Sequence, residues 1–392
     1  MILAYVGGFD PAYPRNAVLR AGLARLGVDV KTLFVSGGGV LGRGAEIVRC
    51  LSSLHPRPDV VLVAEFCHKD VPAAWLGARR IGALCASDPL ISREDTMVGD
   101  WGIYSPRSID GWACRRWDEV AFGWPRVVVA DTAVHARRFA ERVGRPPFPV
   151  VYVGAADEFF DVPDDEPAPS PLRVLYVGGF LPLHGVDSIL EAAEHLKARP
   201  ESPRILLELV GDGIVHDAMR ARATASGLEG HVVFHGRRPL DELAQRMASA
   251  HVVLGVFQRD GEGARVLPNK VVQGLAAGRC IVTSDTAAAR ELLVDDGNAV
   301  LVPAGDGAAL AGALVRLAAD PARRQRIAAA GRSLARTTLS AEATARQLLL
   351  ALGARAEKSP AHAQAQAAAQ HARARRAEPA ITPPVPAAPA GA

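Results

Sequence analysis

Short apolar, β-branched runs alternate along the chain with longer amphipathic stretches. This alternation is typical of parallel-sheet α/β units, in which each strand is followed by a helix. The strands predicted in the first half are Ile2–Val6, Val28–Val35, Asp59–Ala64, Gly82–Ala86, Arg126–Ala130 and Val150–Val153. Those predicted in the second half are Leu172–Val177, Arg204–Val210, His231–His235, Val252–Val256, Cys280–Thr283 and Ala299–Val302.

A stretch rich in proline and acidic residues separates the two halves at positions 161–171. Prolines at this density disrupt helices and central strands, so we expect a solvated linker. The halves begin alike, with Val6-Gly7-Gly8-Phe9 matched by Val177-Gly178-Gly179-Phe180. The pattern predicts two Rossmann-like domains, residues 1–160 and 172–335, that face each other across a cleft. A ligand would lie in that cleft, at the carboxyl ends of the strands.

The end of the chain differs from both halves. An apolar helix is expected within residues 336–353, with Ser340 as its N-cap and a leucine-rich end that docks on the folded body. Residues 354–392 are dominated by Ala and Pro and offer little apolar surface to bury, so we expect them to be disordered.

Composition excludes several classes of protein. Hydrophobic residues make up 49% of the chain and charged residues 22%, as in a globular protein. The net charge of +3 comes from residues 354–392, so the folded part is formally neutral and nucleic-acid binding is disfavoured. No apolar run is long enough for a membrane-spanning helix. The five cysteines form no C-x-x-C pair, which disfavours disulfides and zinc and favours a cytoplasmic protein.

Glycine-rich turns follow several predicted strands and are candidate phosphate sites. Gly8, Gly178, Gly179 and Gly211 stand where a small residue lets backbone N–H groups approach a phosphate. Each turn is also compatible with a turn that binds nothing. None reads G-x-G-x-x-G with an acidic residue at the usual spacing, so a nicotinamide cofactor is disfavoured.

A short helix in the second half has a basic beginning. Pro268 can open this helix and Gly278 can end it, which places Arg265 and Lys270 at its N-terminal end. Two cations beside the positive end of a helix dipole favour a dianion such as a diphosphate. The alternative is that both residues are solvated surface charges.

These stretches together resemble the retaining nucleotide-sugar-dependent glycosyltransferases of the GT-B fold, family-four or group 1 type, over nearly residues 1–352. The motifs that carry the resemblance are V-G-G-F-L-P-L-H-G at 177–185, V-G-D-G at 210–213, the helix ending at Gly278, E-L-L at 291–293 and L-V-P-A-G-D at 301–306. The sequence is similar to a subgroup that reads P-L-H-G and P-N-K.

The chain departs from the family pattern at four donor positions. Arg265 and Gln273 stand where many members have two glutamates, and Gly179 and His184 stand where many have an arginine and a lysine. Arg265 and Lys270 would then supply the missing positive charge.

The resemblance implies a metal-independent transfer, with retention, from a nucleoside diphosphate sugar to a small-molecule or lipid-linked acceptor. No cofactor besides this co-substrate is expected, no D-x-D metal motif is present, and membrane contact would be peripheral at most. The pathway would be natural-product or cell-surface glycan synthesis. A GT-B epimerase and a non-enzymatic sugar-nucleotide sensor are the alternatives.

The resemblance also assigns residues to the two sides of the cleft. The expected catalytic residues are Arg265, Lys270 and His68, where His68 matches a position at which the family often has an active-site histidine. The expected donor contacts are Gly8, Gly178, Gly179, His184, Gly211, Asn269, Gln273 and Glu291. The expected acceptor side comprises Arg15, Asn16 and Asp88, with structural roles such as helix capping or surface loops as alternatives. Four clustered tryptophans between 101 and 124 are expected to pack an acceptor-side insert.

Overall fold

The computed structural model describes residues 1–353 except 166, 169, 200, 202 and 260. Within this part of the chain, five parallel strands form one sheet, ordered β2-β1-β3-β4-β5, and six form another, ordered β11-β10-β9-β6-β7-β8. The first sheet consists of β1 (Ile2–Gly7), β2 (Asp29–Phe34), β3 (Val60–Val63), β4 (Leu84–Ser87) and β5 (Val127–Val128). The second consists of β6 (Leu172–Val177), β7 (Ile205–Val210), β8 (Val232–Gly236), β9 (Val252–Leu254), β10 (Cys280–Ser284) and β11 (Val300–Val302). The predicted α/β class with two Rossmann-like halves is confirmed.

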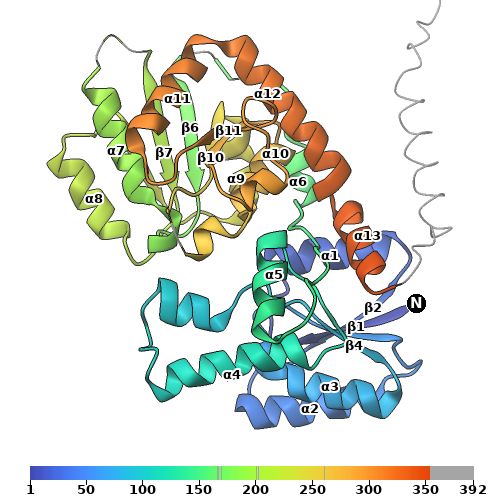
Figure 1. Cartoon of the computed structure of the whole chain (residues 1–392). Coiled ribbons are helices and arrows are strands. Elements are labelled where there is room, and N and C mark those ends of the chain that lie inside the picture. Colours follow the sequence, from blue (N-terminus) through green and yellow to red (C-terminus); the bar gives the residue numbers. More distant parts are fainter. Residues whose placement is uncertain (166, 169, 200, 202, 260, 354–392) are drawn as a thin grey trace, which may run out of the picture.

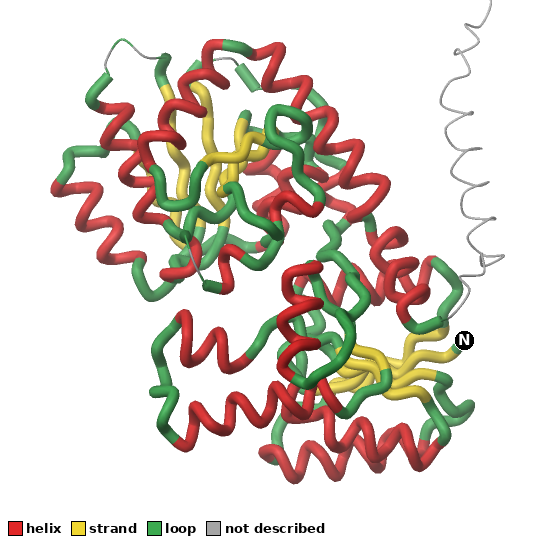
Figure 2. The backbone as a smooth tube through the Cα atoms, viewed as in Figure 1, coloured by secondary structure: helices red, strands yellow, loops and turns green. Residues whose placement is uncertain are grey.

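Helices surround both sheets (Figure 2). Those of the first half are α1 (Pro14–Arg25), α2 (Gly39–Ser53), α3 (Val71–Ile81), α4 (Ile109–Gly123), α5 (Ala133–Arg142) and α6 (Asp157–Phe160). Those of the second half are α7 (Val186–Lys197), α8 (His216–Ala225), α9 (Leu240–Ala248), α10 (Asn269–Ala276), α11 (Gly307–Ala319), α12 (Pro321–Leu334) and α13 (Ala341–Ala351). Single turns of other helix types are η1 (His68–Asp70), η2 (Asp95–Asp100), η3 (Pro182–His184), η4 (Glu262–Ala264), η5 (Ala289–Glu291) and η6 (Ala335–Leu339).

The central strands of both sheets are covered on both faces. β1 and β6 each present an unbroken apolar run that is almost entirely buried, as expected for parallel strands between two layers of helices. β6 and β7 run toward the N-terminal domain (Figure 1). The glycine turns follow the central strands, with Gly8 directly after β1 and Gly178 directly after β6.

The strand predicted at Val150–Val153 does not form. Val150 makes only an isolated bridge with Ala130. The backbone N–H groups of Tyr152 and Ala155 form hydrogen bonds with residues outside the sheet. Tyr152 N–H donates to the Gln347 side chain, and Ala155 N–H donates to the Leu339 carbonyl. The C-terminal segment thus takes the hydrogen bonds that a neighbouring strand would have used.

Residues 162–165, within the segment predicted to be a solvated linker, contact arginines of the C-terminal domain. Arg279 donates to the carbonyls of Pro163 and Asp165. Arg332 donates to the carbonyl of Val162 and pairs with Asp164. These contacts fix the path of the chain between the two domains.

The C-terminal helix returns to the N-terminal domain. α13 packs along α1 (Figure 1), and a Cβ on Gly22 would collide with the backbone of Ala341. Leu348 and Leu349 are buried in the core of the N-terminal domain. The segment 354–392, predicted to be disordered, lies outside the described residues. Within residues 1–353, no described helix has the length and apolarity needed to cross a bilayer.

Candidate functional site

A pocket of about 530 Å³ lies at the carboxyl edge of the C-terminal sheet, where β6, β7 and β8 end. Its lining comprises Val177, Gly178, Gly179, Val210, Gly211, Asp212, Gly213, Arg237, Arg238 and Leu243. Gly178 has φ +156°, and a Cβ there would lie 2.7 Å from Lys270 Nζ. A Cβ on Gly211 would collide with the carbonyl of Gly178. Both turns therefore require glycine, and the predicted donor positions Gly178, Gly179 and Gly211 share one pocket.

Lys270 lies next to this pocket with its charge buried. It occupies the second position of α10, and its Nζ is 4.5 Å from the centre of the Tyr176 ring and 3.5 Å from the Tyr176 hydroxyl. The side chain is 5% exposed, and burial lowers its pKa to about 7. Among the described residues no carboxylate lies within ion-pair distance of it. A lysine held this way beside a glycine turn is prepared for an anionic ligand, because buried charges are otherwise paired.

His184 supports the Gly178 turn. Its Nδ1 is 2.9 Å from the Tyr176 hydroxyl and also hydrogen-bonds the Gly179 carbonyl. Burial, with the nearby Lys270 charge, lowers its pKa to about 3, so the ring is neutral near pH 7. The ring therefore orients the turn rather than adding a positive charge.

Arg265 faces the N-terminal domain. Its carbonyl accepts a hydrogen bond of 2.8 Å from the Thr132 hydroxyl, and its guanidinium lies 3.9 Å from the Asp95 carboxylate. A quarter of the side chain is exposed. Arg265 thus reaches the junction between the domains, and its contact with a diphosphate stays a prediction.

The other predicted residues of α10 are buried. Gln273 is 5% exposed. The Oδ1 atom of Asn269 is buried and has no hydrogen-bond partner. The Asn269 side chain also hydrogen-bonds Tyr13. Burial raises the pKa of Tyr13 to about 12, and this hydrogen bond opposes the rise. Asn269 therefore meets the N-terminal domain at the start of α10.

Glu291 bridges the two domains in this arrangement. Its carboxylate accepts hydrogen bonds from the backbone N–H groups of Ala133 (2.8 Å) and Val134 (3.1 Å), at the N-terminus of α5. A carboxylate at this end of a helix is favoured by the helix dipole. In this arrangement the Glu291 carboxylate contacts α5, and its contact with a donor stays a prediction.

Glu291→Ala is expected to loosen domain closure, because two charge-assisted hydrogen bonds across the junction are lost, each contributing about 1.5–3 kcal/mol. Small-angle X-ray scattering should show a larger radius of gyration than for the wild type. The exposed Glu229→Ala serves as a matched control. An unchanged radius for Glu291→Ala would show that other contacts set the closure.

Gly8 does not offer a free amide to a phosphate. Its N–H donates to Asp70 Oδ2 at 2.9 Å, and Asp70 also pairs with Arg43. Because the amide and the carboxylate already satisfy each other, the first glycine turn is held by the protein itself. The structure therefore does not favour the predicted phosphate contact at Gly8.

The predicted acceptor residues are buried and pair with one another or with the core. Arg15 makes a two-pronged bond to Asp88, at 2.6 and 2.9 Å, and both side chains are at most 1% exposed. Asn16 accepts from the Tyr5 hydroxyl and donates to Glu65. This placement favours structural roles, and direct acceptor contact stays a prediction.

His68 is equally enclosed. Its Nε2 lies 3.0 Å from the Ile91 carbonyl and 3.5 Å from Asp118, and its side chain has no exposed surface. Burial lowers the pKa of the ring. Because the side chain is sealed, it cannot touch an acceptor in this conformation, and the predicted catalytic role has no support from the geometry.

Sequence reasoning missed three notable groups. Tyr176 supports Lys270, and Arg237 and Arg238 line the pocket. The two arginines form a dipeptide that follows the predicted strand His231–His235 after one glycine, which is a signal that can be read from the sequence. Tyr176 lies within a strand and gives no such signal. The described residues contain no group of three or more His, Cys, Asp or Glu side chains that could hold a metal ion.

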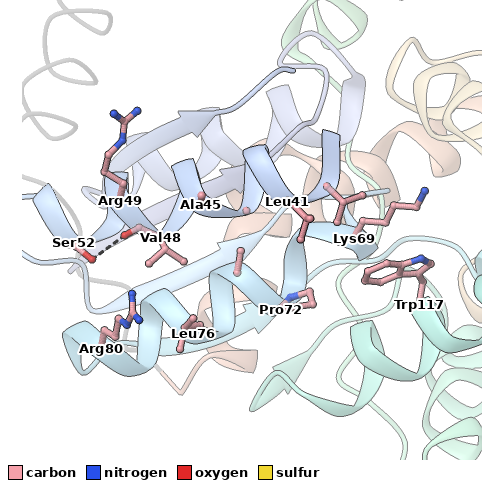
Figure 3. Close-up of a pocket in the computed structure, with 13 residues that line it drawn as sticks. Leu41, Ala45, Val48, Arg49, Ser52, Lys69, Pro72, Leu76, Arg80 and Trp117 are labelled. Carbon is pink, nitrogen blue, oxygen red and sulfur yellow. Dashed lines mark hydrogen bonds between the residues drawn. The ribbon is translucent and has the colours of Figure 1, made fainter. Parts of the chain in front are cut away.

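A second hollow, of about 710 Å³, lies between α2 and α3 (Figure 3). Leu41, Val48 and Leu76 give it an apolar lining, with Arg49 and Arg80 nearby. These helices lie on the side of the N-terminal sheet turned away from the C-terminal domain (Figure 1). This hollow is therefore separate from the pocket of about 530 Å³ lined by Gly178, Gly179 and Gly211, which we call the glycine pocket.

Comparison with known proteins shows which family the second half of the chain is similar to. Residues 171–320 match the model of the group 1 glycosyl transferases. Phosphatidyl-myo-inositol mannosyltransferase of Mycobacterium leprae is 35% identical over 159 residues, 40% of each chain. The lipopolysaccharide core biosynthesis glycosyltransferase LpsE of Rhizobium meliloti is 28% identical over 43% of this chain and 45% of its own. This chain therefore spans less than half the length of these curated relatives, and the family model covers residues 171–320 alone.

Solved structures extend the likeness to both domains. HepE of Anabaena, in complex with UDP, superposes with a TM-score of 0.66 at 17% identity, over 90% of this chain and 99% of its own. Sucrose-phosphate synthase of Thermosynechococcus elongatus gives 0.67 at 16% identity, over 90% and 98%. At this identity the likeness establishes the fold, which is GT-B.

Proposed function

We propose that this chain is a group 1 glycosyltransferase that moves a sugar, with retention and without a metal, from a nucleoside diphosphate donor to a small-molecule or lipid-linked glycan acceptor. The observation that carries the proposal is the buried ammonium of Lys270, which has no carboxylate partner among the described residues and lies beside the Gly178 turn. The names of the curated relatives, which include a phosphatidyl-myo-inositol mannosyltransferase, support such an acceptor.

The chemistry follows from where charge develops. Transfer breaks the bond between the anomeric carbon and a diphosphate oxygen, whose electron pair leaves with the phosphate. Lys270 Nζ and the backbone N–H groups at the start of α10 would stabilise this growing negative charge. Because a bound diphosphate favours the charged lysine, it raises the pKa of Lys270 from about 7.

The acceptor hydroxyl forms the new bond to the anomeric carbon. Retention requires the hydroxyl to attack from the face that the phosphate leaves, so the departing phosphate oxygen can take the hydroxyl proton. This arrangement needs no side-chain base, which is compatible with the enclosed position of His68.

A panel of UDP, GDP, dTDP and ADP sugars tests the proposal. Binding of a donor should raise the melting temperature by mass action, and addition of an acceptor should release the nucleoside diphosphate, also in the presence of EDTA. Conversion of the donor sugar without an acceptor would indicate an epimerase instead. Binding with no turnover for any acceptor tested would favour a sensor.

Arg265→Ala is expected to weaken donor binding about 10- to 150-fold, corresponding to about 1.5–3 kcal/mol for a lost hydrogen bond to a charged group. Isothermal titration with the donor found in the panel measures this effect. Arg57→Ala, an exposed arginine of the N-terminal domain, is the control. Unchanged donor affinity in Arg265→Ala would mean that Arg265 serves only in the contacts between the two domains.

A further inference from the structure

Two arginines at one end of the glycine pocket have no role in the proposed chemistry. Arg237 and Arg238 directly follow β8, are exposed and line the same pocket as Gly178 and Gly211. Within the described part of the chain, neither guanidinium has an ion-pair or hydrogen-bond partner. Their donors are therefore free to meet a ligand.

The order of the strands sets the approximate separation between these arginines and the Gly178 turn beside Lys270. β6, β7 and β8 are neighbours in the sheet, and the Gly178 turn beside Lys270 follows β6. Strands lie about 4.8 Å apart, so the two ends of the pocket are separated by roughly 10 Å. A nucleotide with its diphosphate at Lys270 would therefore present its base to Arg237 and Arg238.

The hydrogen-bond donors of Arg237 and Arg238 favour some nucleotide bases over others. A guanidinium only donates hydrogen bonds, and guanine presents the acceptors O6 and N7 side by side on one edge. Adenine places an amino donor beside N7, and thymine, like uracil, offers the single acceptor O4 on that edge. Leu243 and Val210 add apolar wall for the face of a base.

We propose that the donor is a guanosine diphosphate sugar, whose guanine is recognised through O6 and N7 by Arg237 and Arg238. This inference rests on the proposed function, because it requires a nucleoside diphosphate in the glycine pocket. It adds the identity of the base, which no motif of the sequence indicates.

Isothermal titration of the full chain with GDP, UDP and ADP tests the inference. We expect GDP to bind at least about tenfold more tightly than UDP or ADP, since a two-pronged contact to guanine discriminates by about that factor or more. Inosine diphosphate, which keeps O6 and N7, should bind like GDP. 7-Deaza-GDP, which lacks the N7 acceptor, should bind several-fold more weakly.

The double substitution Arg237→Ala with Arg238→Ala should remove most of the preference for GDP while changing UDP affinity little. Arg220→Ala, on the exposed side of α8, is the matched control and should keep the preference. Tighter binding of UDP or ADP, or an equal loss for all three nucleotides in the double variant, would overturn the guanine assignment and leave the proposed function standing. If none of the three binds, this inference fails, and if dTDP, titrated alongside, does not bind either, the proposed function fails with it.

Discussion

Replacing Lys270 by methionine is expected to lower kcat/KM by about 100- to 1000-fold, the range seen when one group that stabilises a developing oxyanion is removed. Methionine keeps much of the side-chain volume, so the loss reports on charge. Steady-state kinetics with the donor identified by the panel measures the effect. The neutral variant should also have weaker donor affinity, since its diphosphate would lack the only buried ammonium beside the described Gly178 turn.

The same substitution should change the pH dependence of donor binding. Burial lowers the pKa of Lys270 to about 7, so the free protein loses the attracting charge as pH rises above 7. Wild-type affinity should therefore fall by up to about tenfold per pH unit from 7 upward, until the pKa of the bound state is reached. The Lys270→Met variant should show a flat profile between pH 7 and 9. A flat wild-type profile, or equal affinities at pH 7, would contradict the assignment.

Stability gives an independent readout of the buried charge. The pKa of Lys270 in the folded protein, about 7, lies below the ordinary lysine value of 10.5, so between these values the unfolded chain binds more protons than the folded one. The free energy of unfolding contributed by this group therefore rises with pH across that window. Lys270→Met removes the penalty and should melt at a higher temperature than the wild type at pH 7.

Arg15→Ala is expected to lower the free energy of unfolding by about 3–5 kcal/mol, because it leaves the Asp88 carboxylate buried without its partner. Both side chains are at most 1% exposed and share two hydrogen bonds. Burial raises the pKa of Asp88, and Arg15 opposes that rise. Urea unfolding followed by circular dichroism measures the change.

A second variant keeps this prediction testable if Arg15→Ala fails to fold. Arg15→Met combined with Asp88→Leu replaces the pair by apolar groups and should be more stable than either single change. Arg49→Ala is the control, since its side chain is 75% exposed and should alter stability by no more than about 0.5 kcal/mol. A stable Arg15→Ala that lost only turnover would restore the acceptor role predicted from the sequence.

Local patterns were enough to predict the class of fold. The apolar runs at Leu3–Val6 and Val174–Val177 are continuous because parallel strands are buried on both faces. The Gly178 and Gly211 turns and the start of α10 after Pro268 are also local features, set by φ angles and helix capping. The glycines and the proline that mark these features can be read directly from the sequence, although the contacts that require glycine at 178 and 211 come from Lys270 and Gly178 across the fold.

Only the tertiary structure decided which distant groups meet. Arg15 and Asp88 are 73 positions apart, and their pairing depends on which strands become neighbours. Domain closure places Glu291 on α5, and the return of the chain places α13 on α1. Lys270 on α10 is buried against Tyr176 on β6 and the Gly178 turn that follows this strand, and this burial lowers its pKa. The periodicity of a sequence indicates which face of an element a side chain lies on, but not which distant residue it contacts. The chemistry of this site depends on those distant contacts.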